Sequence, residues 1–294
     1  MLAIEYSRQN DRDKGKIAIF GKFYYVIMIQ NIFDFLQNTP PTAPSMIALL
    51  ITVGFFVGFI NTVAGLATII SYGLFMAMGM PINIANGTTR LGVLTQFSAS
   101  SYVFNKEGYL DIKLATKIGI PVAIGSFFGA QLAAYLNPKY MEITMGILLP
   151  LLAVLLLLDT KSLAKKRMSQ DLTHMNIWKF LVFIIVGCYG GFTHAGVGIL
   201  ILFGAFFMLG VDLVKANALK QFAVLIYTPI ALTIFISHGQ VNWPVAIIYA
   251  IGNMAGGFTA SKVAIRFGAK FIKIAVTIMV FTMSFWLLYK NITG

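Results

Sequence analysis

The chain has 294 residues, of which 58% are hydrophobic and only 11% are charged. Soluble domains carry about 25% charged residues, so this composition, with a mean hydropathy of +0.82, excludes a water-soluble globular fold. The 22 basic residues outnumber the 10 acidic ones, but most of them stand in short segments between apolar runs, as in positive-inside loops. The charge therefore does not indicate nucleic-acid binding. The single cysteine, Cys188, excludes disulfides within the chain and a thiolate metal cage.

Residues 1–44 are predicted to form an N-terminal extension. Its charged stretch at 7–16 has no cleavable apolar core before it, so the extension does not resemble a signal peptide. The segment at 22–36 is largely apolar but contains Gln30 and Asp34. This segment either lies in the membrane interface as an amphipathic helix or crosses the bilayer, and the sequence leaves both readings open.

Long apolar segments follow one another from residue 45 onward. They are mostly 15–25 residues long and show no two-residue alternation, so they predict helices and not the strands of a barrel. The first group covers 45–61, 65–80, 87–105, 112–136 and 140–159, and the second covers 180–193, 197–211, 214–236, 243–265 and 269–290. The predicted fold class is therefore all-α, as a polytopic membrane protein.

The two groups resemble each other at a nearly constant spacing. The pattern VG…GF…G at 53–65 recurs at 186–198, which is 133 residues later. GYLD (108–111) matches GQVN (239–242), and IGSF (124–127) matches AGGF (255–258), both 131 residues later. Three matches in the same order predict a duplication. The predicted domains are a first transmembrane repeat at 45–159, a cytoplasmic basic linker at 160–179 and a second transmembrane repeat at 180–294.

Lysine and arginine positions predict that the two repeats have opposite orientations in the membrane. In the first repeat the loop at 106–117 is basic, whereas the corresponding loop at 237–243 has no lysine or arginine and the next loop, at 262–273, is basic. Inversion requires an odd number of crossings in each repeat. We therefore expect two inverted-topology repeats, each a broken helical hairpin followed by three transmembrane helices, as in many secondary transporters.

Glycine spacing predicts close contacts between helices. GxxxG motifs are formed by Gly54 and Gly58, Gly125 and Gly129, Gly187 and Gly191, and Gly252 and Gly256. Such pairs let two helix backbones approach closely. Packing alone is one explanation of these glycines, and lining a narrow path is the other.

Two cations stand in the apolar parts of the chain. Arg90 is the only charged residue between Asp34 and Lys106, and Lys220 lies at about the matching place of the second repeat. An intramembrane cation is costly and indicates a functional site. Both stand near the predicted start of a helix, where free N–H groups and the dipole favour an anion. The candidate substrate-binding residues of these two segments are Arg90, Lys220, Asn86, Thr88, Thr89 and Asn217. The alternative is that both cations extend to opposite membrane interfaces.

The breaks of the two hairpins supply further candidates. Unwound backbone at such breaks can face the same cavity as the cations, although a glycine break is also explained by tight helix contact. His194 could bind an anion, relay a proton or simply make a hydrogen bond. The candidate substrate-binding residues of the breaks are Asn61, Thr62, Gly65, His194, Gly196 and Gly198.

The sequence offers little support for catalysis. HExxH, GxSxG and P-loop motifs are absent, and no pair of carboxylates lies inside an apolar segment. The three histidines, His174, His194 and His238, are scattered along the chain, so no metal site is predicted. We expect no catalytic residue and no cofactor, and without a nucleotide-binding motif any transport would be secondary.

The arrangement resembles the TauE/SafE sulfite-exporter family of permeases over about residues 45–290. The motifs that carry the resemblance are GFINTVAG (58–65), ANGTTRL (85–91), GYLD (108–111), GGFTHAGVG (190–198), ANALK (216–220) and GQVNW (239–243). The resemblance implies an inverted-repeat helical fold, a bacterial or archaeal inner membrane, and a small anion bound between the halves. It places Arg90 and Lys220 at the basic positions and Thr88 and Thr89 at the small polar ones. The chain departs from the family pattern at 65–68 and at His194, which leaves the particular anion open.

These observations together predict a secondary transporter that exports small anions, namely sulfite, organosulfonates or related sulfur oxyanions. The expected partners are the anionic substrate and membrane lipid, with no nucleic acid, and the sequence leaves a homodimer open. One alternative is an intramembrane enzyme or lipid-phosphate handler, in which the same cations hold a phosphate headgroup. A third interpretation is an anion channel.

Overall fold

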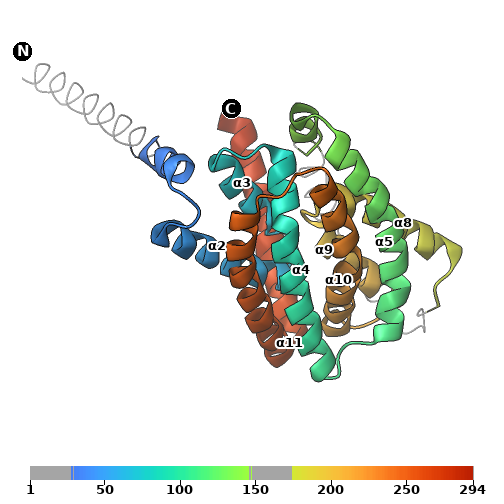
Figure 1. Cartoon of the computed structure of the whole chain (residues 1–294). Coiled ribbons are helices and arrows are strands. Elements are labelled where there is room, and N and C mark those ends of the chain that lie inside the picture. The colour runs from blue at the N-terminus through green and yellow to red at the C-terminus, as the bar shows by residue number, and fades with distance from the viewer. Residues whose placement is uncertain (1–27, 29, 146, 148–173, 294) are drawn as a thin grey trace, which may run out of the picture.

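The structure is a computed structural model that describes residues 28, 30–145, 147 and 174–293 (Figure 1). In this part of the chain all regular structure is helical, which confirms the predicted all-α class. Helices satisfy their backbone groups internally, as hydrocarbon requires. Most of the predicted linker at 160–179 and most of the apolar segment at 140–159 lie outside the described residues. Residues 30–38 of the N-terminal extension are helical.

The first half contains four named helices, α2 (Pro44–Val63), α3 (Thr68–Ala77), α4 (Ile82–Lys106) and α5 (Ile112–Tyr135). Residues 138–145 are also helical. Proline at the start of α2 fits the first helical position, where no N–H bond is lost. Asp111 caps α5 because its side chain accepts a hydrogen bond from the N–H of Leu114 at 2.9 Å.

The second half follows the same order. Its helices are α8 (Ile177–Thr193), α9 (Val197–Phe203), α10 (Leu213–Ser237) and α11 (Trp243–Thr293), and a π-helix at Gly204–Met208, labelled η1, continues α9. Asn176 caps α8 and Asp212 caps α10 through side-chain oxygens. Gly268 has a non-helical backbone inside α11, with φ 66°. This glycine divides α11 near the boundary predicted between 243–265 and 269–290.

Three described helices are long and apolar enough to cross a membrane, namely α2, α5 and α10. Helix α4 has 25 residues, which at about 1.5 Å per residue is also sufficient for a hydrocarbon core of about 30 Å. Its sequence is more polar because its buried face carries polar side chains, three of which form hydrogen bonds to the other half. These buried polar residues of α4 are Asn86, Thr88, Thr89, Arg90, Gln96, Ser100 and Ser101.

Each half of the chain packs its first helix against the last helix of the other half or its equivalent, and we call the two resulting pairs the exchanged helix pairs. Helix α2 of the first half packs along α11 of the second, and α8 of the second half packs along α5 of the first. Helices α4 and α10 contact each other between these two pairs, and α4 also packs on α11 and α10 on α5 (Figure 1). Equivalent helices of the two predicted repeats therefore make equivalent contacts.

The four GxxxG motifs lie at these exchanged contacts, which confirms the predicted close packing. A Cβ added at Gly58 would lie 2.8 Å from Cα of Asn253, and one added at Gly256 would lie 2.8 Å from the backbone nitrogen of Phe59. In the other pair, Gly191 faces the backbone of Ser126 and Gly129 faces the backbone of Cys188. Only glycine permits such backbone approach.

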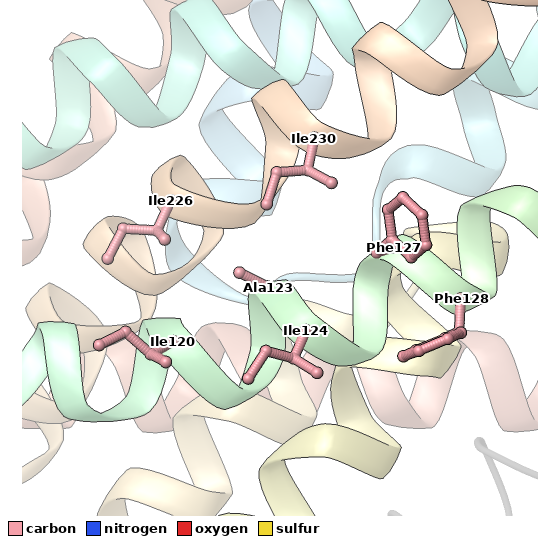
Figure 2. Close-up of a pocket in the computed structure, with 7 residues that line it drawn as sticks. All are labelled: Ile120, Ala123, Ile124, Phe127, Phe128, Ile226 and Ile230. Atoms are coloured by element: carbon pink, nitrogen blue, oxygen red, sulfur yellow. The ribbon is translucent and has the colours of Figure 1, made fainter.

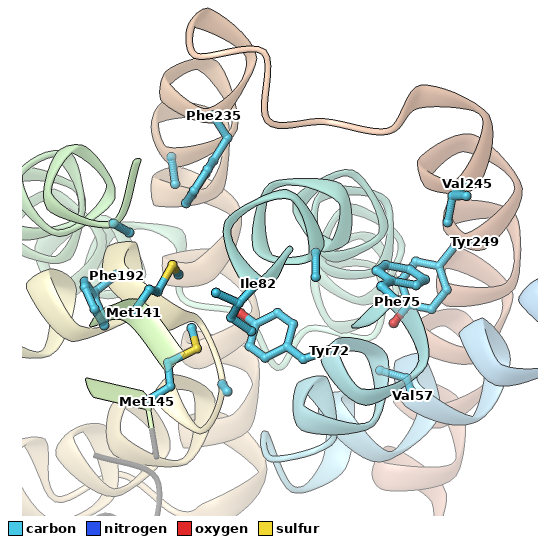
Figure 3. Packing of buried hydrophobic residues seen from close by; sticks show 14 of the residues in the cluster. Val57, Tyr72, Phe75, Ile82, Met141, Met145, Phe192, Phe235, Val245 and Tyr249 are labelled. Carbon is cyan, nitrogen blue, oxygen red and sulfur yellow. The ribbon is translucent and has the colours of Figure 1, made fainter. Parts of the chain in front are cut away.

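One hydrophobic cluster joins both halves around the start of α4 (Figure 3). Tyr72 and Phe75 of α3 meet Tyr249 of α11, and the rings of Phe75 and Tyr249 pack edge to face with centroids 5.1 Å apart. Phe192 at the end of α8 and Phe235 of α10 belong to the same cluster. The cluster fixes the end of α8 beside the first turns of α4.

The outer surface of α5 and α10 is apolar. A groove of about 430 Å³ between these helices is lined entirely by hydrophobic side chains (Figure 2). Such a surface would be unfavourable in water and is the surface expected against lipid chains. The lining residues are Ile120, Ala123, Ile124, Phe127, Phe128, Ile226 and Ile230.

Candidate functional site

The breaks of the two hairpins meet inside the molecule. Helix α2 ends at Val63 and α8 ends at Thr193, close to the positions predicted. Gly65 has φ +80°, and a Cβ added at Gly198 would lie 3.0 Å from Cα of Gly65. The backbones of the two halves therefore also touch at the predicted break glycines, Gly65 and Gly198.

Asn61 closes the first break through its own side chain. Its Oδ1 accepts a hydrogen bond from the N–H of Ala67 at 2.8 Å, and its Nδ2 donates to Oγ1 of Thr68 at 2.8 Å. Because both amide atoms are used within the hairpin, the side chain of Asn61 has a structural role. Its main-chain carbonyl accepts a hydrogen bond from Lys220 of the second half.

His194 closes the second break in a different way. It has φ 56°, the only positive φ of a non-glycine residue in the described part of the chain, and this conformation costs about 1–2 kcal/mol. The ring nitrogen Nδ1 lies 2.5 Å from the hydroxyl of Tyr227 on α10. Gly196, the next predicted residue, has φ 81° and is the N-cap residue of α9. The contact between His194 and Tyr227 thus holds the second break against α10.

Arg90 is completely buried and holds the end of α8. Its Nη1 donates to the carbonyl of Gly190 at 2.9 Å and its Nη2 to the carbonyl of Gly191 at 2.6 Å. Its Nε donates to Oδ1 of Asn86 at 3.2 Å, one turn earlier on α4. The guanidinium also lies 5.3 Å from the ring centroid of Phe235. A cation at this position interacts favourably with the carboxyl end of the helix dipole.

The two remaining carbonyl groups in the last turn of α8 also accept hydrogen bonds from first-half side chains. Asn86 donates through Nδ2 to the carbonyl of Phe192 at 2.7 Å, and the hydroxyl of Tyr72 donates to the carbonyl of Thr193. The last carbonyl groups of a helix have no partner within the helix. Here all four accept hydrogen bonds from first-half side chains, those of Arg90, Asn86 and Tyr72.

Lys220 holds the end of α2 from the other half. Its Nζ donates to the carbonyl of Thr62 at 2.7 Å and to that of Asn61 at 3.2 Å. Gln221 donates through Nε2 to the same Thr62 carbonyl at 2.8 Å and to Oδ1 of Asn217 at 3.0 Å. The Thr62 hydroxyl accepts a hydrogen bond from Nε2 of Gln96 at 3.1 Å. Each half therefore caps the broken helix of the other.

The contacts correct one detail of the predicted symmetry. Arg90 bonds to Asn86 four residues earlier, and in the second half it is Gln221, and not Lys220, that bonds to the asparagine four residues earlier, Asn217. The sequence contained this signal, since Ala-Asn at 85–86 recurs at 216–217, 131 residues later. The same spacing pairs Arg90 with Gln221 and leaves Lys220 at the position of Thr89.

Thr88 and Thr89 of α4 form hydrogen bonds with backbone groups. Oγ1 of Thr88 accepts a hydrogen bond from the N–H of Asn242 at 3.0 Å, just before α11, and Oγ1 of Thr89 donates to the carbonyl of Asn86 at 2.7 Å. The structure therefore brings Arg90 and Asn86 together at the end of α8. Lys220 contacts the end of α2, and Asn217 is linked to the same place through Gln221. Thr88 lies at the loop before α11. Tyr72, Gln96 and Tyr227 were not predicted, because single polar groups in apolar runs carry no motif.

No buried carboxylate faces the two cations within the described part of the chain. All five described acidic residues are exposed, whereas Arg90 and Lys220 have no exposed surface. The five exposed acids are Asp34, Glu107, Asp111, Glu142 and Asp212. Among the same residues there is also no cluster of histidine, cysteine and acidic side chains that could hold a metal ion. No carboxylate of the described residues therefore compensates the charges of these two buried cations.

Comparison with known proteins agrees with this architecture. The sequence profile of the family described as "Sulfite exporter TauE/SafE" matches residues 50–287. The chain is 26% identical over 247 residues to a "Probable membrane transporter protein" of Haemophilus influenzae, covering 84% of this chain and 96% of that protein. It is 24% identical over 250 residues to the "Probable membrane transporter protein YfcA" of Escherichia coli, covering 85% and 92%. No solved structure matches the chain. The chain belongs to the TauE/SafE sulfite exporter family, and it is a membrane transporter.

Proposed function

We propose that the protein is a secondary exporter of small anions, with sulfite, organosulfonates or related sulfur oxyanions as its substrates. The family name supports this substrate class. The relatives in Haemophilus influenzae and Escherichia coli support a bacterial inner membrane as its location. Arg90 and Lys220 neutralise the anion, and neighbouring amide and hydroxyl groups orient it.

The observation that carries the proposal is the pair of buried cations. The hydrogen-bond partners of both side chains are neutral oxygens, mainly backbone carbonyl groups. Burying a charge is expensive unless an opposite charge compensates it. Three of the five Arg90 donors and two of the three Lys220 donors are used in these bonds. A small oxyanion would supply both the missing charge and the missing acceptors.

The exchange of helix pairs supports alternating access between two inverted repeats. Helix α2 packs on α11 and α8 packs on α5, so each hairpin contacts the other half. Moving one half against the other therefore changes the environment of the hairpin breaks at Gly65 and Gly198. Rocking of one repeat against the other around a central site is the mechanism of many inverted-repeat transporters.

Sulfite counterflow into proteoliposomes tests the proposal. Wild-type protein should give saturable, sulfite-dependent exchange. Arg90→Gln and Lys220→Gln should each reduce the initial rate roughly tenfold or more, because a charge-assisted hydrogen bond contributes about 1.5–3 kcal/mol. Lys215→Gln is the matched control, since it removes an exposed lysine from the same helix.

Three outcomes would contradict the proposal. Wild-type flux in both Gln variants would remove Arg90 and Lys220 from the site. Conductance that does not saturate would favour an anion channel. Conversion of a lipid phosphate without solute flux would favour an intramembrane enzyme.

A further inference from the structure

Asn217 is an unusual residue among the buried polar groups. It has no exposed surface, and its Nδ2 has no hydrogen-bond partner. The other buried side-chain atoms without a partner in the described part of the chain are all oxygens, so Nδ2 of Asn217 is the only nitrogen among them. An unsatisfied buried N–H group costs about 1–3 kcal/mol. Such a group calls for an acceptor that binds there.

The orientation of the Asn217 amide is fixed by its neighbours. Nε2 of Gln221 donates both to the carbonyl of Thr62 at 2.8 Å and to Oδ1 of Asn217 at 3.0 Å. The Thr62 carbonyl can only accept, so Gln221 must present its nitrogen there. Turning the Asn217 amide around would then place its nitrogen against the nitrogen of Gln221. The NH₂ group of Asn217 is therefore left as the free donor.

Lys220 lies one turn from Asn217 on the same helix. Residues three apart on a helix are neighbours on its surface. The ammonium group uses two of its three donors, on the carbonyls of Asn61 and Thr62. Helix α10 thus carries a spare amide donor and a cation with a spare donor side by side.

The first half has no such spare amide. Asn86, the equivalent of Asn217, donates to the carbonyl of Phe192 at 2.7 Å, and its Oδ1 accepts from Nε of Arg90 at 3.2 Å. Its amide therefore serves to hold α8. The asparagine is common to both halves, but only in the second half does its amide nitrogen donate no hydrogen bond.

We propose that the transported anion is held asymmetrically: its direct hydrogen bonds come from Nδ2 of Asn217 and Nζ of Lys220 on α10, Arg90 contributes its charge, and Asn86 serves only to position α8. This inference rests on the proposed anion transport. It adds that the direct hydrogen bonds to the anion come from the second half of the chain. The matching ligand is a small anion with at least two acceptor oxygens, such as sulfite, that reaches both donors at once.

Sulfite uptake by wild-type, Asn217→Ala and Asn217→Asp protein in proteoliposomes tests this inference. Removal of the amide donor in Asn217→Ala should raise the KM for sulfite about tenfold, and the carboxylate of Asn217→Asp should raise it further. Asn105→Asp introduces the same change at an exposed position of α4 and should leave the KM unchanged. Sulfite should also raise the Tm of wild-type protein more than that of Asn217→Ala.

The outcomes separate this inference from the proposed function. Saturable sulfite uptake by the wild type with an unchanged KM in Asn217→Ala would overturn the asymmetric site and leave anion transport standing. Absence of sulfite uptake by the wild type would overturn the proposed function itself. If Asn217→Asp does not fold, Asn217→Ala decides the matter, because Gln221 keeps its bond to Thr62 in that variant.

Discussion

The last turn of α8 ends inside the protein, where water cannot satisfy its carbonyl groups. Arg90, Asn86 and Tyr72 supply the donors instead. The sequence identified Arg90 and Lys220 because a lone cation in an apolar run is conspicuous. It could not show what they bind, because the partner carbonyls lie 100 residues or more away in the chain. Tyr72 carries no signal in sequence, since a tyrosine in an apolar helix is as often simply packed.

Replacing Tyr72 by phenylalanine measures one of these caps. Tyr72→Phe keeps the ring but removes the hydroxyl that donates to the carbonyl of Thr193. We expect the protein to lose about 1–2 kcal/mol of stability, measured as a lower Tm in detergent. Tyr102→Phe, at a tyrosine that is 62% exposed, should not change the Tm. Equal Tm values for both variants would show that the hydroxyl of Tyr72 does not stabilise the end of α8.

At the scale of helices, the sequence predicted most element ranges and both hairpin breaks. Apolar length fixes where a helix can cross, and Gly65 and Gly198 mark the breaks. The exchange of α2 and α8 between the halves was not predicted. A GxxxG motif shows that a helix face is flat, but it does not identify which helix packs there.

A methyl group at the contact of α5 with α8 tests that packing. In Gly125→Ala the added Cβ would meet the backbone of Ile184 and Cys188, so we expect a loss of about 1–3 kcal/mol and a lower Tm. Gly73→Ala is the control, because nothing lies within 4 Å of the added Cβ and alanine favours a helix by about 1 kcal/mol. Equal thermal stability of Gly125→Ala and wild-type protein would contradict the close contact.

At the scale of the whole molecule, each half holds the hairpin of the other by a buried cation. Lys220 reaches the end of α2, and Arg90 reaches the end of α8. The repeats are not identical, since Gln221 stands opposite Arg90 and Asn217 keeps a free donor. The proposed asymmetric anion site rests on these differences between the two halves.

Thiol labelling in intact cells tests whether the repeats are inverted. Cysteines are introduced at exposed Glu107 and exposed Ser237, the equivalent loops of the two halves, in a Cys188→Ala background. A membrane-impermeant reagent should label Ser237→Cys and not Glu107→Cys, because basic loops such as that at 106–117 are expected on the cytoplasmic side. Labelling of both positions, or of neither before the cells are opened, would contradict inversion.

The most direct measurement of where the anion binds is a crystal structure of the wild-type protein with selenite, the heavier analogue of sulfite, after transport of selenite has been demonstrated. The anomalous scattering of selenium locates the anion. We expect a selenium peak between the ends of α2 and α8, placed so that an oxygen of the selenite lies within hydrogen-bond distance of Nζ of Lys220. A selenium peak confined to exposed lysines of the loops, at a concentration that saturates transport, would contradict a site built on the buried cations.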